Sequence, residues 1–297
     1  MMKLSQQKQA LLEKLLREEG LATPAQPVVT RRDRSNHYPL SYAQQRLWFL
    51  DQLEPGGAFY NIPVAIRLVG VVDEKVLSQV VNEVVRRHEI LRTTFPTVDD
   101  RPVQKIAPEL VVALPVEDLT SIPDGERERQ ARELAQMEAQ RPFDLVTGPL
   151  LRVRLLRLTA TEHIVLFTVH HIAADGWSTG VLVQEVVALY TAYVQRQPSP
   201  LPELPMQYAD FAQWQRQWLS GPVLQQQLTY WTEHLGGVPA VLNLPTDRPR
   251  PSVQSYRGTT HSFTVAAPTV TGLHHVGRHV QATLFMTLAA ALNVLLA

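Results

Sequence analysis

Three stretches in the middle of the chain have the hydrophobic pattern of β-strands. Apolar residues recur at every second position over 64–69, and mostly apolar runs occupy 150–158 and 163–169. The few polar residues between the last two runs predict that these strands form a hairpin. A fourth strand is predicted over 259–265.

Helical patterns lie between and after these strands. Asp73 can cap a helix that runs to about His88, and Ser178 can cap another whose apolar residues repeat at helical spacing. Further helices are predicted over 125–141, 208–219 and 223–235. This order of elements predicts an α/β (α+β) fold in two layers, with a mixed sheet flanked by helices.

Both ends of the chain carry apolar helical segments. The segment 1–20 has a face of leucines and predicts a helix that serves docking or interaction, or that packs on the main body. Residues 21–37, with two prolines and four consecutive charged residues, predict a linker. The last helical segment, which begins near Leu284, has almost no polar face, so we expect further polypeptide to bury it.

Charge and composition narrow the classes of function. The 28 basic and 28 acidic residues balance, which does not favour a nucleic-acid binder or a charge-driven membrane binder. No apolar run approaches the roughly 20 residues of a membrane span. The absence of cysteine excludes disulfides, thiolate metal sites and a cysteine nucleophile. We therefore expect a cytoplasmic protein without nucleic-acid or membrane partners.

The most informative residues follow the predicted strand over 163–169. His170, His171, Asp175 and Gly176 form the pattern HHxxxDG directly after this apolar run. Imidazoles and carboxylates are costly to bury, and histidine is the side chain best suited to proton transfer near neutral pH. Neighbouring residues on a strand face opposite ways, which argues against both histidines binding one metal ion. The pattern predicts proton-transfer chemistry, and we expect no metal.

Three further motifs occur in a fixed order around HHxxxDG. The chain reads SYAQQRLWFL at 41–50, RHEILRTTF at 87–95 and YADFAQW at 208–214. Together these four motifs resemble the condensation domains of nonribosomal peptide synthetases, which belong to the chloramphenicol-acetyltransferase-like superfamily. The resemblance covers residues 38–297.

The resemblance implies an architecture and a set of partners. Residues 38–204 would form the first of two similar lobes, and residues 205–297 the crossover and the incomplete beginning of the second. Donor and acceptor peptidyl carrier proteins would present substrates on 4'-phosphopantetheine arms, with no cofactor bound by the domain itself. An adenylation domain and the remainder of the second lobe would complete the synthetase. We expect this chain alone to be inactive.

The resemblance also implies an amide-forming acyl transfer and assigns roles around the motif. His171 would be the catalytic base or would position the attacking amine, and His170 would orient the loop. Gly176 would let a ligand approach the backbone, and its N–H would stabilise the developing oxyanion. Trp177 and Ser178 would line the substrate tunnel.

Asp175 has two possible roles. It could orient His171, as in a catalytic triad, or form a buried ion pair that holds the loop, which is the role the resemblance favours. We predict Arg87 as the ion-pair partner, with Arg92 as the alternative. Arg46, on its predicted helix, is expected to stabilise the fold.

Other functions compete with this interpretation. The first motif favours a domain that accepts an L-configured donor. An epimerization domain also carries HHxxxDG, but SYAQQRLWFL is typical of condensation domains. A non-catalytic fragment that only binds carrier proteins remains a further alternative. His275 and His279 have the spacing of a helical metal pair but no evident third ligand, so we interpret them as a solvated helix face.

Overall fold

The structure is a computed structural model that describes residues 29–32, 35, 37–239, 241, 244, 246–249, 251, 258 and 261–296. The described residues up to Tyr230 belong to one compact unit, and those from Trp231 belong to a second. The predicted helix over 1–20 and most of the predicted linker lie outside the described residues.

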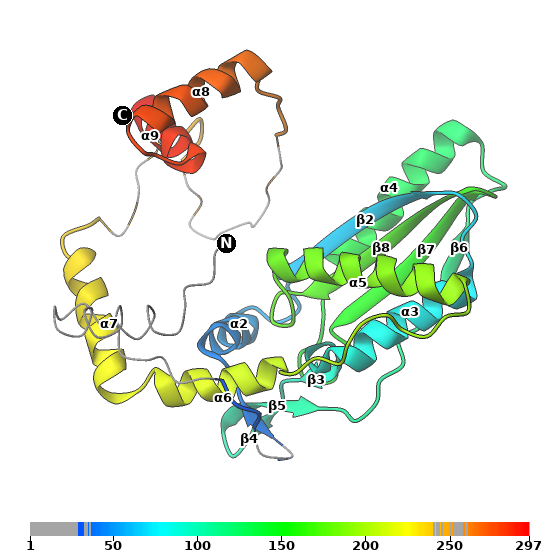
Figure 1. Cartoon of the computed structure of the whole chain (residues 1–297), viewed down its shortest axis with the longest axis horizontal. Helices are drawn as coiled ribbons and strands as arrows, with labels where there is room; N and C mark the ends of the chain where they lie inside the picture. Colours follow the sequence, from blue (N-terminus) through cyan, green and yellow to red (C-terminus); the bar gives the residue numbers. More distant parts are fainter. Residues whose placement is uncertain are drawn as a thin grey trace, which may run out of the picture. The chain divides into compact units, whose positions relative to one another are not determined.

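A four-stranded mixed sheet forms the centre of the first unit (Figure 1). Its order is β2 (Asn61–Val69), β8 (Glu162–His170), β7 (Leu151–Thr159) and β6 (Val116–Asp118). β2, β8 and β7 pair antiparallel, whereas β6 runs parallel to β7. The antiparallel pairing of β7 with β8 confirms the predicted hairpin. β2 lies at an edge of this sheet.

Helices cover both faces of the sheet (Figure 1). α3 (Glu74–Arg87) and α5 (Gly176–Val194) enclose the larger apolar core against one face, and α4 (Asp124–Gln140) encloses a smaller core against the other. Asp73 caps α3 as predicted, since its carboxylate accepts hydrogen bonds from two N–H groups of the first turn. The predicted α/β fold with a mixed sheet flanked by helices is confirmed, but helices on both faces give three layers where two were predicted.

A smaller sheet and three helical segments complete the first unit. The sheet joins β1 (Tyr38–Pro39), β5 (Arg101–Ile106), β3 (Thr93–Thr94) and β4 (Thr97–Val98). Beside it lie α2 (Tyr42–Leu53), the 3₁₀ segment η1 (Glu89–Arg92) and α6 (Tyr208–Trp218), which contacts β1 and η1. The first compact unit therefore extends past residue 204, and α7 (Gly221–His234) spans the division between the two units.

Two sequence-based assignments differ from the structure. α5 begins at Gly176, so its cap is Asp175 and not Ser178. The carboxylate of Asp175, one residue before the helix, accepts a hydrogen bond from the N–H of Ser178 in the first turn. The helix therefore begins directly after Asp175. Residues 261–265, the described end of the predicted fourth strand, form no strand. Alternating apolar residues make a strand only where a neighbouring strand accepts their hydrogen bonds.

The second unit contains two helices, α8 (Ala267–His279) and α9 (Leu284–Leu296). No residue of α9 is buried by the described residues, although the predicted apolar character is present all round this helix. The described residues leave α9 uncovered, and its burial by further polypeptide stays a prediction. No described helix is by itself long and apolar enough to cross a membrane; α8 and α9 reach that length only together, bent by 102°.

Truncation of Leu189 tests the packing of α5 on the main core. This side chain is fully buried, so Leu189→Ala should lower the free energy of unfolding by about 2–5 kcal/mol. Val194→Ala, at an exposed position of the same helix, should change it by less than about 0.5 kcal/mol. Urea denaturation measures both values, and equal losses would contradict the described packing.

Candidate active site

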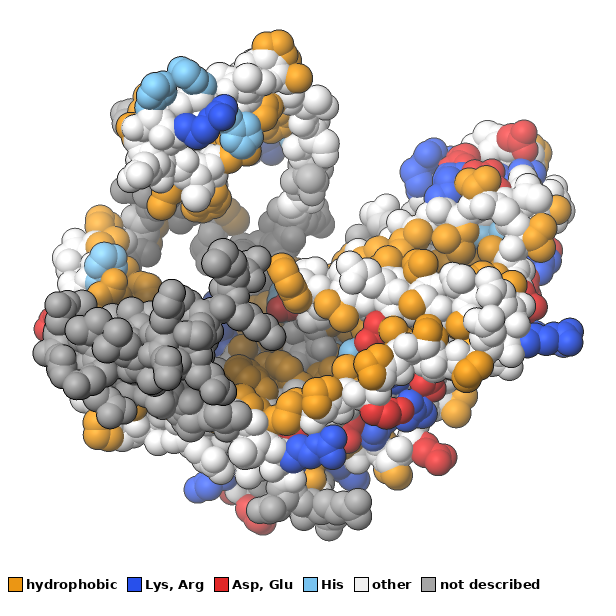
Figure 2. Space-filling view, viewed as in Figure 1, with side chains coloured by type: hydrophobic (Ala, Val, Ile, Leu, Met, Phe, Trp, Pro, Cys, Tyr) orange, Lys and Arg blue, Asp and Glu red, His pale blue; other side chains and the backbone are white. Residues whose placement is uncertain are grey.

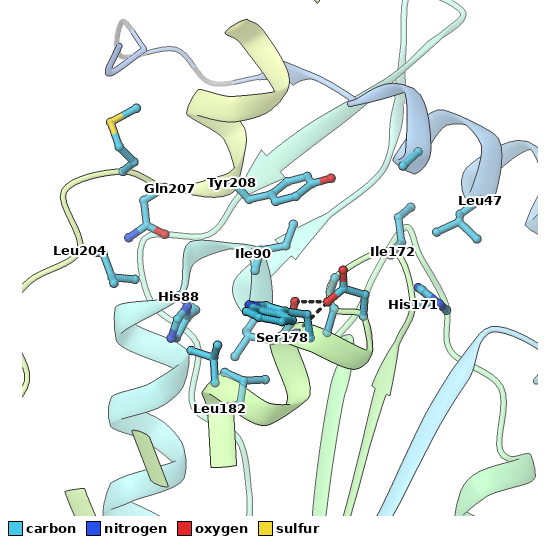
Figure 3. Close-up of a pocket in the computed structure, with 18 residues that line it drawn as sticks. Leu47, His88, Ile90, His171, Ile172, Ser178, Leu182, Leu204, Gln207 and Tyr208 are labelled. Carbon is cyan, nitrogen blue, oxygen red and sulfur yellow. Dashed lines mark hydrogen bonds between the residues drawn. The ribbon is translucent and has the colours of Figure 1, made fainter. Parts of the chain in front are cut away.

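The HHxxxDG segment connects the end of β8 to the start of α5 and borders a cavity of about 380 Å³. Figure 3 shows this cavity between the beginning of α5, the end of α3 and the segment that leads into α6. Its lining residues are Ala43, Leu47, His88, Ile90, Leu91, residues 171–175, Trp177, Ser178, Val181, Leu182, Leu204, Met206, Gln207 and Tyr208. Figure 2 shows further hydrophobic side chains along α5 and the neighbouring part of the sheet.

His170 points into the protein and not into the cavity. Its ring is buried in edge-on contact with Phe143 and Tyr60, with centroid distances of 6.0 and 6.2 Å. Its Nδ1 accepts a hydrogen bond of 3.1 Å from the N–H of Ile172. Burial, with the nearby His171, lowers the pKa of His170 to about 4, so this imidazole is neutral at pH 7. It therefore holds the turn that follows β8.

His171 is exposed and lines the cavity (Figure 3). Its N–H donates to the carbonyl oxygen of Tyr60 at 2.7 Å, which fixes the backbone, while no described residue forms a hydrogen bond with its imidazole. The strand alternation thus sends the two histidines to different environments, as the sequence predicted. Within the described ranges, no group of three or more His, Cys, Asp or Glu residues is placed to hold a metal ion.

Asp175 is the N-cap of α5. Its carboxylate accepts hydrogen bonds from the N–H and the hydroxyl of Ser178, at 2.7 and 2.6 Å. These hydrogen bonds lower the pKa of Asp175, with a smaller contribution from His171. Asp175 is exposed, and within the described part of the chain it forms no hydrogen bond with His171 and no ion pair. The predicted ion pair with Arg87 or Arg92 is therefore wrong.

Arg87 pairs instead with a glutamate of α5. Its guanidinium is 3.2 Å from both carboxylate oxygens of Glu185 and donates to the carbonyl of Pro202 at 2.9 Å. His88 Nε2 lies 2.8 Å from the same carboxylate. Burial alone would raise the pKa of Glu185, but the hydrogen bonds from Arg87 and His88 hold it below its ordinary value. Arg92 donates to the carbonyl of Ala107.

The remaining predicted residues have different surroundings. Trp177 and Ser178 both line the cavity, and Trp177 is 85% exposed. A Cβ at Gly176 would meet no atom within 4 Å, so the backbone at the start of α5 faces open space. Arg46 is exposed and forms no hydrogen bond or ion pair with a described residue, so the described chain does not support its predicted structural role.

Sequence reasoning missed several residues that build the cavity wall. The hydroxyl groups of Ser41 and Tyr208 lie 3.0 Å apart and join α2 to α6. Gln207 donates to the carbonyl of Arg87 at 2.8 Å and accepts from the N–H of Glu89 at 3.1 Å. All but Gln207 belong to the motifs at 41–50, 87–95 and 208–214, so motif membership was the signal that could have found them.

Comparisons with known proteins agree with this geometry. The condensation-domain family model matches residues 34–297, so the chain belongs to the condensation-domain family. A linear gramicidin synthase polypeptide of Brevibacillus parabrevis is 49% identical over 263 residues, which are 89% of this chain and 5% of that protein. Phosphinothricin tripeptide synthetase PhsC of Streptomyces viridochromogenes is 41% identical, over 99% of this chain and 27% of its own length. The chain therefore spans a small part of these curated relatives.

Solved structures share the fold. The X-domain from teicoplanin biosynthesis, in its complex with OxyB, aligns with a TM-score of 0.76 and 30% identity over 88% of this chain and 56% of its own. The starter condensation domain of rhizomide synthetase RzmA aligns with a TM-score of 0.62 and 26% identity, over 69% of this chain and 49% of its own.

The depressed pKa of His170 predicts a loss of stability in acid. The unfolded chain binds a proton at this residue below about pH 6.5, whereas the folded chain does so only near pH 4. The contribution is complete above about pH 6.5 and is lost as the pH falls toward 4, by up to about 3 kcal/mol. Urea unfolding at several pH values measures this loss. His170→Asn, which cannot titrate, should flatten the profile; parallel profiles would contradict the assignment.

Two carboxylates should differ in their effect on stability. Glu185→Ala leaves the buried Arg87 without its charge partner and should lower the free energy of unfolding by about 3–5 kcal/mol. Asp175→Ala removes only a helix cap and should cost about 1 kcal/mol. Chemical denaturation of both variants tests the corrected pairing, and a larger loss for Asp175→Ala would contradict it.

Proposed function

We propose that this chain carries the acid–base side of an amide-forming acyl transfer between a carrier-bound thioester donor and the amine of a carrier-bound aminoacyl acceptor. The observation that carries this proposal is the position of His171. Its imidazole is accessible, faces a mainly apolar cavity and is unengaged by described residues, while Tyr60 accepts its backbone N–H and His170 accepts that of Ile172. Membership of the condensation-domain family supports the same reaction.

His171 would act on the proton that the reaction releases. The acceptor amine attacks the thioester carbonyl, and the new C–N bond leaves a positively charged nitrogen and an oxyanion. The imidazole of His171 takes the proton from this nitrogen, the carbonyl re-forms, and the departing thiolate accepts that proton from the imidazolium. Histidine is the side chain best suited to take up a proton near neutral pH, and such help is worth about 10²–10⁴-fold in rate.

The start of α5 would stabilise the oxyanion. Gly176 is the first residue of this helix, so its N–H has no preceding turn to accept it. The open space above Gly176 leaves room for a carbonyl to approach, and the helix N-terminus favours negative charge there. The side chain of Asp175 is occupied by Ser178, so its role is to fix this helix start.

The partners follow from the same reaction. Peptidyl carrier proteins would deliver both substrates on phosphopantetheine arms, and adenylation domains would load them. Trp177 and Ser178, at the cavity, would line the path of the arm. Similarity to linear gramicidin synthase and phosphinothricin tripeptide synthetase supports such an assembly. We also propose an L-configured donor, on the sequence of the first motif, and a cytoplasmic location.

A second candidate function is binding of a partner protein without catalysis. The observation that favours it is the X-domain of the same fold, which forms a complex with OxyB. The two functions differ in one property of His171. A binding surface would tolerate its replacement, whereas an acyl transferase would not.

Replacement of His171 tests the proposed reaction in the intact protein. His171→Ala should slow amide formation between donor- and acceptor-loaded carrier proteins by about 10²–10⁴-fold, because the nitrogen then loses its proton unassisted. Asp175→Asn should keep the rate within about tenfold, since asparagine also caps helices. Single-turnover product formation gives both rates, and thermal unfolding verifies the fold. Wild-type turnover in His171→Ala would favour the binding function instead.

A further inference from the structure

The cavity wall contains a second histidine, and most polar groups around it are already engaged. Apart from backbone groups, the wall is apolar except for seven side chains: His88, His171, Asp175, Trp177, Ser178, Gln207 and Tyr208, of which Trp177 can only donate, through its indole N–H. Asp175 and Ser178 bond each other, Gln207 bonds the backbone on both sides of His88, and Tyr208 bonds Ser41. The two histidines therefore retain the hydrogen-bonding capacity that a ligand could use.

Contacts from α5 fix the orientation of His88. This residue is the C-cap of α3, and its side chain keeps 18% of its surface accessible. Its Nε2 lies 2.8 Å from the carboxylate of Glu185, which Arg87 holds from the other side. A neutral imidazole that donates from Nε2 to a carboxylate presents Nδ1 as an acceptor. No described residue donates to this Nδ1, and it is not among the buried side-chain atoms without a partner.

The two histidines lie on opposite sides of the cavity. Figure 3 shows His88 at the end of α3 and His171 on the loop after β8, with the start of α5 between them. An aminoacyl thioester on a pantetheine arm carries polar groups at two points along its length. Its amine is the reacting group, and the first amide N–H of the arm follows a few bonds beyond the sulfur.

We propose that Nδ1 of His88 binds the substrate by accepting a hydrogen bond from a secondary amide N–H of the pantetheine arm. The inference rests on the proposed function, because it requires the acceptor amine to lie at His171. Glu185 is then a positioning residue, since it fixes the tautomer and the direction of the His88 ring. The carboxylate that holds α3 to α5 therefore also orients the His88 ring for a second contact with the substrate.

Two substitutions separate the proposed contact from the structural role of His88. In His88→Gln, the amide occupies the place of Nε2 and can still reach Glu185, but the Nδ1 acceptor is lost. His88→Gln should therefore fold normally and bind free pantetheine about 3- to 10-fold more weakly in titration calorimetry. His163→Gln is the matched control, because His163 is buried at the far end of β8, roughly 25 Å along the strand from the HHxxxDG segment.

Spectroscopy and kinetics supply readouts that a structural role would not move. In the protein labelled with ¹⁵N-histidine, the Nδ1 resonance of His88 is assigned by its absence from the spectrum of His88→Gln. Pantetheine should shift this resonance. The KM for an aminoacyl-pantetheine acceptor should rise by the same 3- to 10-fold, with kcat little changed. An N-acetyl amino acid amide, which carries amide N–H groups without the arm, tests whether a peptidyl donor supplies the N–H instead.

Each outcome decides one claim. Equal pantetheine affinity in wild type and His88→Gln would overturn the inference, and so would a shift produced only by the amino acid amide. If pantetheine binding depends on His88 while His171→Ala keeps full turnover, the contact stands and the proposed role of His171 falls. If His171→Ala abolishes turnover and His88→Gln changes neither affinity nor KM, the proposed function stands and the contact does not exist.

Discussion

One buried carboxylate, that of Glu185, connects the elements on which the candidate site depends. It accepts hydrogen bonds from Arg87 at the end of α3 and contacts His88, while Arg87 also reaches the carbonyl of Pro202 in the segment before α6. A buried charge is tolerated only when its partners neutralise and hydrogen-bond it, so these three segments are stable in one arrangement. That arrangement holds α3 against α5, whose N-terminus directly follows the motif loop.

The sheet supplies the second constraint. β8 ends at His170, and the alternation of its side chains places that ring in the core and the next one at the cavity. The buried ring holds the turn, and the accessible ring of His171 is the one proposed to take part in the reaction. Two neighbouring residues, His170 and His171, thus have different surroundings, because successive side chains of a strand point to opposite faces.

Local patterns predicted much of the fold and of the motif loop. The hairpin of β7 and β8 and the Asp73 cap of α3 depend on neighbouring residues, and both agree with the structure. Pairing between distant residues could not be predicted from local patterns. The predicted partner of Asp175 was Arg87, whereas in the structure Arg87 pairs with Glu185, 98 residues away. One signal was present in the sequence. Glu185 is the lone acidic residue in an apolar helical stretch, where a charge requires a buried partner.

Among the described strands β2 lies at an edge of its sheet, and this position bears on association with other chains. An open strand edge offers unpaired backbone groups to other chains and invites strand-to-strand association. Pro63, within β2, removes one N–H from that strand, which is tolerated at an edge and would weaken a central strand. Arg67 adds a charged side chain, paired with Glu128 and Glu162, near the other end. The strand therefore carries two features that oppose continuous pairing with a foreign strand while its inner edge remains bonded to β8.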